Sequence, residues 1–193
     1  IEGNAAVGSL HVRDVLKLHA LVGQKGALDR EPVGLFRPYG VRVGGHLPPP
    51  AKEVPGLMAE LLDWVNGPGK VWPAVVSSAI LHFQFEHIHP FGDGNGRVGR
   101  VLAAWELYHR KFDTHHVFAV DEILLEDRQG YYAALERVRA QSQDLTSWLE
   151  YIAGAVHEAL KRAWKRLEAL DVGVKGGGMT LSPKQETLLG LLR

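Results

Sequence analysis

The sequence predicts an all-α fold, and three observations lead to this prediction. Apolar residues recur at the three- and four-residue spacing of amphipathic helices in six segments: 10–22, 54–65, 73–85, 97–108, 131–138 and 145–170. The alternating pattern that is typical of a strand occurs in one short stretch, from Val41 to Val43. Hydrophobic residues make up 46% of the 193 residues and charged residues 23%, which is ordinary for one globular domain with an apolar core.

The segment between the first two predicted helices differs from the rest of the chain. Residues 34–46 carry glycines near both ends and the alternating residues Val41, Arg42 and Val43, so we expect a short exposed β-hairpin, or flap. Three consecutive prolines at 48–50 then hold the chain extended before the next helix.

The last predicted helix is followed by a glycine-rich stretch, which we interpret as a linker at 172–180. Beyond it, Ser182 and Pro183 suit the N-cap and first turn of another helix, whose leucines have nothing left to cover them. We therefore expect one main domain at 1–171 and, at 181–193, the start of a truncated C-terminal domain.

Composition restricts the classes of partner. Lys plus Arg and Asp plus Glu each total 22, so no overall charge attracts nucleic acid or an anionic membrane, and phosphate binding must be local. The chain has no cysteine, which excludes disulfides, thiolate metal sites and a cysteine nucleophile. No segment approaches the roughly 20 apolar residues that span a bilayer, so we expect no membrane contact and a cytoplasmic location.

The segment 89–100, His-Pro-Phe-Gly-Asp-Gly-Asn-Gly-Arg-Val-Gly-Arg, carries the chemistry. Gly94, Asn95 and Gly96 precede a helix and can turn successive N–H groups toward one anion, to which the positive end of the helix adds. Arg97 and Arg100 lie three residues apart, on one face of that helix, where both can contact a polyphosphate. The segment therefore predicts a phosphate site.

Two further residues of this segment suit a phosphate-transfer reaction. Asp93 is a hard oxygen ligand for the Mg²⁺ that accompanies nucleotide phosphates. His89 has an ordinary pKa near neutrality and can take the proton of an attacking hydroxyl. Ile88 and Phe91 are predicted to be apolar anchors that fix the loop to the core.

This segment resembles the signature of the Fic family at each defining position: His, Pro, Phe, an acidic residue, Gly-Asn-Gly-Arg, and a second Arg three residues later. The resemblance implies a helical Fic-type bundle with a hairpin flap, and a protein adenylyltransferase that moves AMP from ATP onto a Ser, Thr or Tyr hydroxyl of a target protein. It implies His89 as the base, Asp93 on Mg²⁺, and the phosphates of ATP on the 94–96 amides, Arg97 and Arg100.

The resemblance assigns further residues. Glycine at position 94 favours AMP transfer, because Doc-like relatives, which phosphorylate, carry lysine there. Val41, Arg42 and Val43 would dock the target, and Tyr131 and Tyr132 resemble the segment beside the adenine, with one of the two in the core. Arg139 stands where several relatives have Asn, which leaves the nucleotide preference open.

The first four residues, Ile-Glu-Gly-Asn, resemble the second half of the inhibitory motif of Fic proteins that inhibit themselves through an N-terminal helix. In such relatives a glutamate pairs with the second signature arginine and removes it from the γ-phosphate. Glu2 is therefore the predicted inhibitor of Arg100, with removal of AMP as a second activity. A homodimer that controls Glu2 is compatible with the sequence, which does not predict it.

Alternatives remain open. Residues 182–193 resemble the first helix of a winged-helix module, so the chain could instead be a nucleotide-sensing regulator that binds DNA through a further C-terminal domain. A phosphotransferase is disfavoured by Gly94. The remaining histidines are interpreted as solvated or as lying at the edge of the core: His82, His87, His115 and His116.

Overall fold

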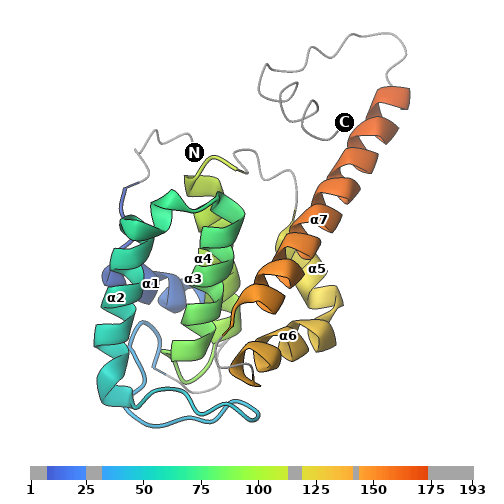
Figure 1. Ribbon diagram of the computed structural model, residues 1–193. Helices are drawn as coiled ribbons and strands as arrows, with labels where there is room; N and C mark the ends of the chain where they lie inside the picture. The colour runs from blue at the N-terminus through green and yellow to red at the C-terminus, as the bar shows by residue number, and fades with distance from the viewer. Residues whose placement is uncertain (1–7, 25–31, 113–118, 141–143, 174–193) are drawn as a thin grey trace.

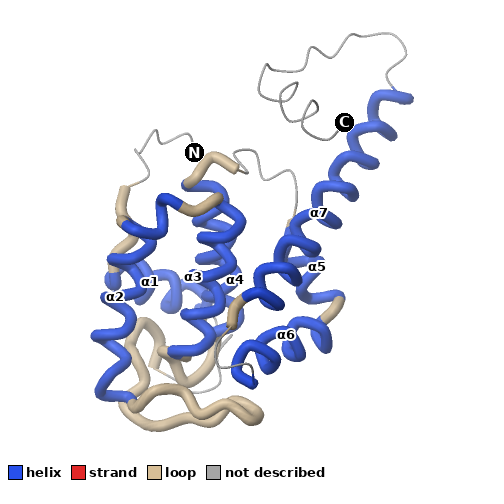
Figure 2. Tube along the Cα trace, viewed as in Figure 1, coloured by secondary structure: helices blue, strands red, loops and turns tan. Residues whose placement is uncertain are grey.

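The computed structural model describes residues 8–24, 32–112, 119–140 and 144–173. Within these ranges the chain forms helices and no strand, so the predicted all-α fold is confirmed (Figures 1 and 2). The helices are α1 (Val12–Val22), α2 (Val54–Asn66), α3 (Ala74–Ile88), α4 (Asn95–His109), α5 (Val120–Glu126), α6 (Arg128–Ala140) and α7 (Thr146–Gly173).

The central helix is α3, which buries side chains on all of its faces. One apolar cluster joins it to α5, α6 and α7 through residues that include Phe83, Leu135 and Trp148. A second cluster joins its other side to α1, α2 and α4 through Phe85 and Leu102, among others. A helix that is apolar all round is typical of a buried position, and each large side chain that it buries stabilises the fold by about 1.5–3 kcal/mol.

The loop between α3 and α4 lies at one end of this core. Helices α3 and α4 pack side by side, and the long loop before α2 runs beneath the ends of α2 and α3 (Figure 1). The two loops meet where the amide of Arg37 donates a hydrogen bond of 2.9 Å to the carbonyl of Pro90. The two loops therefore lie next to each other at one end of the helix bundle.

The predicted β-hairpin at 34–46 is not confirmed. Val43 and His46 form one isolated bridge, with hydrogen bonds of 3.0 and 2.9 Å in the two directions, around a turn at Gly44 (φ 56°). The rest of the segment is loop (Figure 2). The prolines at 38 and 48–50 have no amide N–H to donate, so strand pairing cannot extend beyond the turn.

Helix boundaries shift by a few residues from the predicted ones. Helix α4 begins at Asn95, two residues early, and α3 continues to Ile88. Helix α5 has only seven residues and was not predicted, because two turns give too short a periodic pattern. Helix α7 extends to Gly173, into the predicted linker, and most of 172–180 and all of 181–193 lie outside the described residues.

None of the helices in the described ranges combines the length and the apolar composition that a bilayer-spanning segment requires.

Candidate active site

The candidate site begins where α3 ends. The amide of His89 donates a hydrogen bond of 2.9 Å to the carbonyl of Phe85, and His89 then adopts the left-handed conformation with φ 49° and ψ 62°. This conformation is rare for a residue with a side chain and costs about 1–3 kcal/mol, so the surrounding contacts must fix it. It reverses the chain direction and starts the loop that leads to α4.

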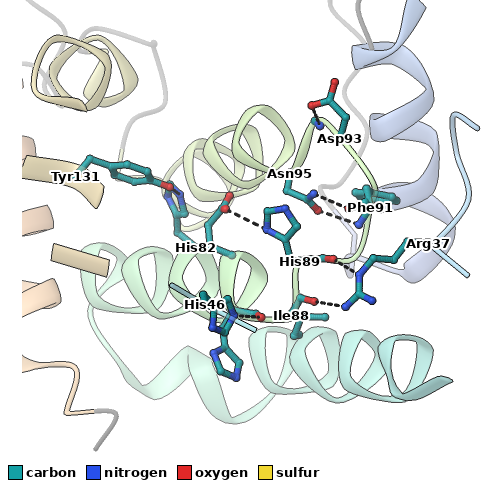
Figure 3. Close-up of polar contacts among 12 residues, drawn as sticks. Arg37, His46, His82, Ile88, His89, Phe91, Asp93, Asn95 and Tyr131 are labelled. Carbon is teal, nitrogen blue, oxygen red and sulfur yellow. Dashed lines mark hydrogen bonds and ion pairs between the residues drawn. The ribbon is translucent and has the colours of Figure 1, made fainter. Parts of the chain in front are cut away.

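Two buried residues hold this loop against the core. Phe91 is 0% exposed and Ile88 is 4% exposed, which confirms the prediction that both are apolar anchors. The side chain of Asn95 accepts a hydrogen bond of 2.9 Å from the amide of Phe91 and donates one of 2.8 Å to its carbonyl (Figure 3). The Asn95 side chain is therefore committed to the loop, and only its backbone amide can serve an anion.

Helix α4 starts directly after Gly94, which has φ 84° and forms the N-cap. The first amides of any α-helix have no acceptor within the helix, and the helix dipole adds a partial positive charge there, so the N-terminus of α4 attracts anions. The amide of Gly94 itself donates to Oδ1 of the neighbouring Asp93. The predicted amides are thus brought together at one helix end, with that of Gly94 occupied by a carboxylate.

The predicted metal ligand and the first arginine lie side by side. Nη2 of Arg97 is 3.3 Å from Oδ2 of Asp93, and both side chains are 40% exposed. This is a surface ion pair four residues apart on the sequence, which contributes little to stability. Both groups therefore remain accessible to a charged ligand at the mouth of the loop.

Arg100 lies beside the start of α4, where its Nη1 is 3.4 Å from the position that a Cβ on Gly96 would take. It lines a cavity of about 220 Å³ between α4, α5 and α6, together with Arg128 and Tyr132. It also borders a mainly apolar cavity of about 240 Å³ with His82 and Leu107. Two guanidinium groups, Arg100 and Arg128, thus converge on one opening beside the loop.

The two tyrosines of α6 have different environments. Tyr131 is 5% exposed and its hydroxyl lies 3.0 Å from Nε2 of His82 inside the core (Figure 3). Tyr132 is 52% exposed and borders the opening with Arg100. Both tyrosines line this opening, Tyr132 with about half of its side chain exposed and Tyr131 with a small part of its surface.

His82 corrects one of the expectations. It is 1% exposed, so the interpretation of this residue as solvated or at the edge of the core is wrong. Burial lowers its pKa to about 3, and Arg100 contributes to the same shift, so His82 is neutral. It can be buried because Tyr131, from another helix, supplies a hydrogen-bond partner. Residues 115 and 116 lie outside the described part of the chain.

His89 has the environment of a neutral base. Its side chain is 14% exposed, and its Nδ1 lies 3.9 Å from Oε2 of Glu86. Burial lowers the pKa of His89 to about 4, against the opposing effect of the Glu86 backbone carbonyl, and nearby Arg37, His46 and Arg139 lower it further. The imidazole is therefore unprotonated near neutral pH, as a residue that accepts a proton must be.

Arg37 was not predicted to belong to the site. It is 3% exposed, and its guanidinium donates to four backbone carbonyls: His89 at 2.7 Å, Tyr39 at 2.7 Å, Pro49 at 2.7 Å and Ile88 at 3.3 Å. It thereby joins both sides of the flap loop to the end of α3, and Figure 3 shows its bonds to His89 and Ile88. An arginine in a loop gives no sign in the sequence that it will be buried in this way.

His19 of α1 is a second residue that sequence reasoning missed. Its Nδ1 accepts a hydrogen bond of 3.0 Å from the amide of Gly34, so its Nε2 carries the proton that is donated to the carbonyl of Asp93 at 3.1 Å. Its ring stacks on Phe91 with 3.7 Å between centroids. His19 thus connects the start of the flap loop to the predicted metal ligand.

Arg139 lies between the flap turn and His89. Its side chain is 17% exposed and pairs with Glu136 at 3.3 Å, while its Nε is buried without a hydrogen-bond partner among the described residues. The Glu136 carboxylate lies 3.6 Å from where a Cβ on Gly45 would stand.

Val41, Arg42 and Val43 belong to the same loop as Gly45, with Arg42 exposed. Glu2 lies outside the described residues.

Comparisons with known proteins agree with this geometry. The sequence model of the Fic/DOC family matches residues 9–107, just over half of the chain. Proteins named protein adenylyltransferase Fic are 41% identical over 93 residues in Drosophila willistoni and 39% identical over 92 residues in Drosophila melanogaster. In both cases the match covers 47% of this chain and 18% of the relative, so the chain spans less than a fifth of these curated proteins.

Solved structures extend the likeness to the whole described fold. A Fic family protein from Desulfovibrio desulfuricans has a TM-score of 0.71 and 32% identity, over 98% of this chain and 58% of that one. Fic-1 from C. elegans has a TM-score of 0.69 and 24% identity, over 83% of this chain and 45% of that one, which is a likeness of fold. The chain belongs to the Fic/DOC family.

Proposed function

We propose that this chain is a protein adenylyltransferase, which transfers AMP from ATP to a Ser, Thr or Tyr hydroxyl of a target protein. The observation that carries the proposal is the loop from His89 to Asn95, which has a neutral buried imidazole at one end and a helix N-terminus at the other. A proton acceptor and an anion site on one short loop suit attack by a hydroxyl on a phosphate. The name of the Drosophila relatives, protein adenylyltransferase, supports the same reaction.

The reaction would proceed in line. His89 takes the proton of the target hydroxyl, the oxygen forms a bond to the α-phosphorus of ATP, and the bond from that phosphorus to the bridging oxygen of pyrophosphate breaks. Negative charge spreads over the phosphate oxygens as this happens. The first amides of α4, together with Arg97 and Arg100, would stabilise that charge, and such preorganised donors usually make the largest catalytic contribution.

The residues present fit a magnesium ion held mainly by the nucleotide. The described residues contain no group of three or more His, Asp or Glu side chains that could hold a metal by themselves. Asp93 supplies one accessible carboxylate beside the helix N-terminus, and Mg²⁺ usually takes one or two carboxylates together with phosphate oxygens and waters. Asp93 would hold the ion, which supplies charge neutralisation on the phosphates when bound.

Two other contact regions complete the proposed site. Tyr132 at the opening beside Arg100 is the main candidate for the adenine side, and Tyr131, which lines the same opening from the core, would hold it in place. Val41, Arg42 and Val43 would present backbone groups of the flap loop to an extended target segment. The single bridge at the tip of this loop leaves most of those backbone groups unpaired by strand partners within the described residues.

Regulation by Glu2 is part of the proposal. A carboxylate that pairs with Arg100 would satisfy both groups and remove the arginine from the γ-phosphate. Removal of AMP through Glu2 and DNA binding through a C-terminal domain that begins at 181–193 are predictions from the sequence, and both concern residues outside the described part of the chain. A homodimer that controls Glu2 is compatible with the proposal but is not predicted by the sequence.

The test is mass spectrometry of the chain after incubation with ATP and Mg²⁺, for the native protein, Glu2→Gly and His89→Ala. The proposal expects an AMP adduct on the chain itself that is strongest in Glu2→Gly and absent in His89→Ala. Adduct formation that persists in His89→Ala would contradict the assigned base. Absence of any adduct in the three proteins, despite ATP binding, would contradict self-modification as an activity of this chain.

A further inference from the structure

Glu86 is a buried carboxylate that the fold does not explain. It is 7% exposed, on the last turn of the central helix α3, and it is the one residue of that helix that is Asp, Glu, Lys or Arg. Its Oε1 is buried and has no hydrogen-bond partner among the described residues. A buried carboxylate oxygen without a hydrogen-bond partner is unfavourable, so its presence calls for a functional reason.

The facing helix α4 leaves space for the Glu86 carboxylate at Gly99. Gly99 on the facing helix α4 lies so close that a Cβ there would stand 2.7 Å from Oε1 of Glu86 and 3.2 Å from Phe85. A glycine inside a helix costs about 1 kcal/mol relative to alanine. The close approach explains why this position lacks a side chain, and it shows that α4 leaves room for the carboxylate.

The second oxygen of Glu86 faces the base of the active site. Oε2 lies 3.9 Å from Nδ1 of His89, which forms no hydrogen bond of ordinary geometry among the described residues, and the backbone carbonyl of Glu86 also lies close enough to the ring to raise the pKa of His89. Glu86 and His89 are three residues apart, and His89 adopts the left-handed conformation that ends α3. Since Nδ1 faces Glu86, Nε2 is the nitrogen left for a substrate.

We propose that Glu86 is a positioning residue for His89: its carboxylate keeps a proton on Nδ1, orients the imidazole, and stabilises the imidazolium that forms when Nε2 takes the proton of the target hydroxyl. The inference rests on the proposed adenylyl transfer. The Nδ1 proton stays on the ring throughout, and Glu86 itself gains no proton. A carboxylate that holds the tautomer of a catalytic histidine in this way has a large effect on rate in serine proteases.

The surroundings of Glu86 give its carboxyl group a pKa near neutral pH. Burial raises the pKa of Glu86 to about 7, against the opposing effects of Arg100 on α4 and Arg139 on α6. Tyr131 on α6 also faces it, with its own pKa raised mainly by burial and further by Glu86. The carboxylate form, which supports an imidazolium, therefore becomes populated as the pH rises through about 7.

The chain offers a matched control in Glu106. This carboxylate is 1% exposed on α4, and its Oε1 accepts hydrogen bonds of 2.7 Å from Ser77 and 3.2 Å from Arg110. Its Oε2, like Oε1 of Glu86, is buried without a hydrogen-bond partner among the described residues, so the two carboxylates differ mainly in that only Glu86 faces His89. Glu106→Gln removes a buried charge, as Glu86→Gln does, without touching His89. A purely structural role for Glu86 would make the two variants behave alike.

The experiment measures kcat and KM for AMP transfer across the neutral pH range in the native chain, Glu86→Gln and Glu106→Gln, with folding checked by circular dichroism. Glu86→Gln is expected to lower kcat about 10- to 100-fold, to leave KM for ATP within about threefold, and to lose the rise of kcat through pH 7. Glu106→Gln keeps that rise. A Glu86→Gln variant with native kcat and a native pH profile overturns the proposal.

A second measurement does not need activity, and so separates this inference from the proposed function. Nitrogen NMR of the full chain, labelled in its histidine rings, reports the tautomer of His89, whose signals are identified by their loss in His89→Ala. The native chain is expected to carry the proton on Nδ1, and Glu86→Gln to lower the pKa of His89 or change its tautomer. Gly99→Ala, which displaces the carboxylate, should act in the same direction, whereas unchanged His89 signals in both variants refute the inference even if AMP transfer is observed.

Discussion

The Nε of Arg37 donates a hydrogen bond of 2.7 Å to the carbonyl oxygen of His89, so a buried cation from the flap loop fixes the backbone of the proposed base. The same guanidinium reaches Tyr39, Pro49 and Ile88, and all four acceptors are backbone carbonyls. The rare backbone conformation of His89 therefore depends on a residue 52 positions earlier in the chain.

Arg37→Ala is expected to lower the free energy of unfolding by about 3–5 kcal/mol, because it leaves several buried carbonyls without donors. Arg37→Lys should recover only part of this loss, since an ammonium cannot reproduce the planar fork. Urea unfolding curves measure both effects. Arg13→Ala, at a side chain that is 74% exposed, serves as the control and should change stability by no more than about 0.5 kcal/mol. A similar small change for Arg37→Ala would contradict the assigned role.

The buried neutral His82 predicts a loss of stability in acid. Its pKa is lowered from 6.5 to about 3 in the folded chain, so its contribution is present above pH 6.5 and is lost as the pH falls toward 3. One proton gives a slope of about 1.4 kcal/mol per pH unit.

The native chain should therefore lose about 2 kcal/mol more than His82→Gln between pH 6.5 and about pH 5. Glutamine can still bond to Tyr131 but does not titrate, while His89 and Glu86 titrate in both proteins and cancel in the comparison. Unfolding free energies from urea at the two pH values provide the test. Equal slopes in the two proteins would show that His82 is not buried in the neutral form.

Gly94→Ala is expected to lower both stability and nucleotide affinity. The residue has φ 84°, where a Cβ costs about 1–2 kcal/mol, and relief of that strain would move the first amides of α4. Gly154→Ala is the matched control in α7, because a Cβ there meets nothing within 4 Å, and it should raise stability by up to about 1 kcal/mol. Thermal unfolding and ATP titration follow the two effects, and unchanged ATP binding in Gly94→Ala would argue against a phosphate site at this helix end.

The two tyrosines of α6 should separate binding from stability. Tyr131→Phe removes the hydroxyl that meets His82 and is expected to cost about 1 kcal/mol of stability with little change in ATP affinity. Tyr132→Ala should leave stability within about 0.5 kcal/mol and weaken ATP binding. Calorimetric titration with ATP, combined with thermal unfolding of each variant, measures both. The reverse pattern would place the adenine elsewhere.

The sequence predicted the long helices and the reactive loop because these depend on local patterns. The spacing of apolar residues located α2 and α7 to within a few residues. The residue types from His89 to Arg100 were enough to predict a phosphate site in the loop before α4. The prediction of a hairpin around Val43 was too long, because the structure has one bridge there. The neighbouring prolines prevent the strand pairing that the weak alternation of Val41, Arg42 and Val43 indicated.

The contacts that support the loop could not be predicted in the same way. Arg37 and His19 reach it from 52 and 74 positions away, and such pairings depend on how the helices pack. His82 was misjudged for the same reason, because its partner Tyr131 comes from another helix. Only Glu86 could have been noticed in the sequence as a residue that supports the site, because it is the single charged residue of an apolar helix that ends beside the proposed base.

The most direct test of AMP transfer is to trace which phosphate of ATP reaches protein. Glu2→Gly and Glu2→Gly combined with His89→Ala are incubated with Mg²⁺ and ATP radiolabelled on either the α- or the γ-phosphate. We expect that protein is labelled from the α-phosphate and not from the γ-phosphate, and that the label disappears with His89→Ala. Label from the γ-phosphate would show a phosphotransferase and contradict AMP transfer.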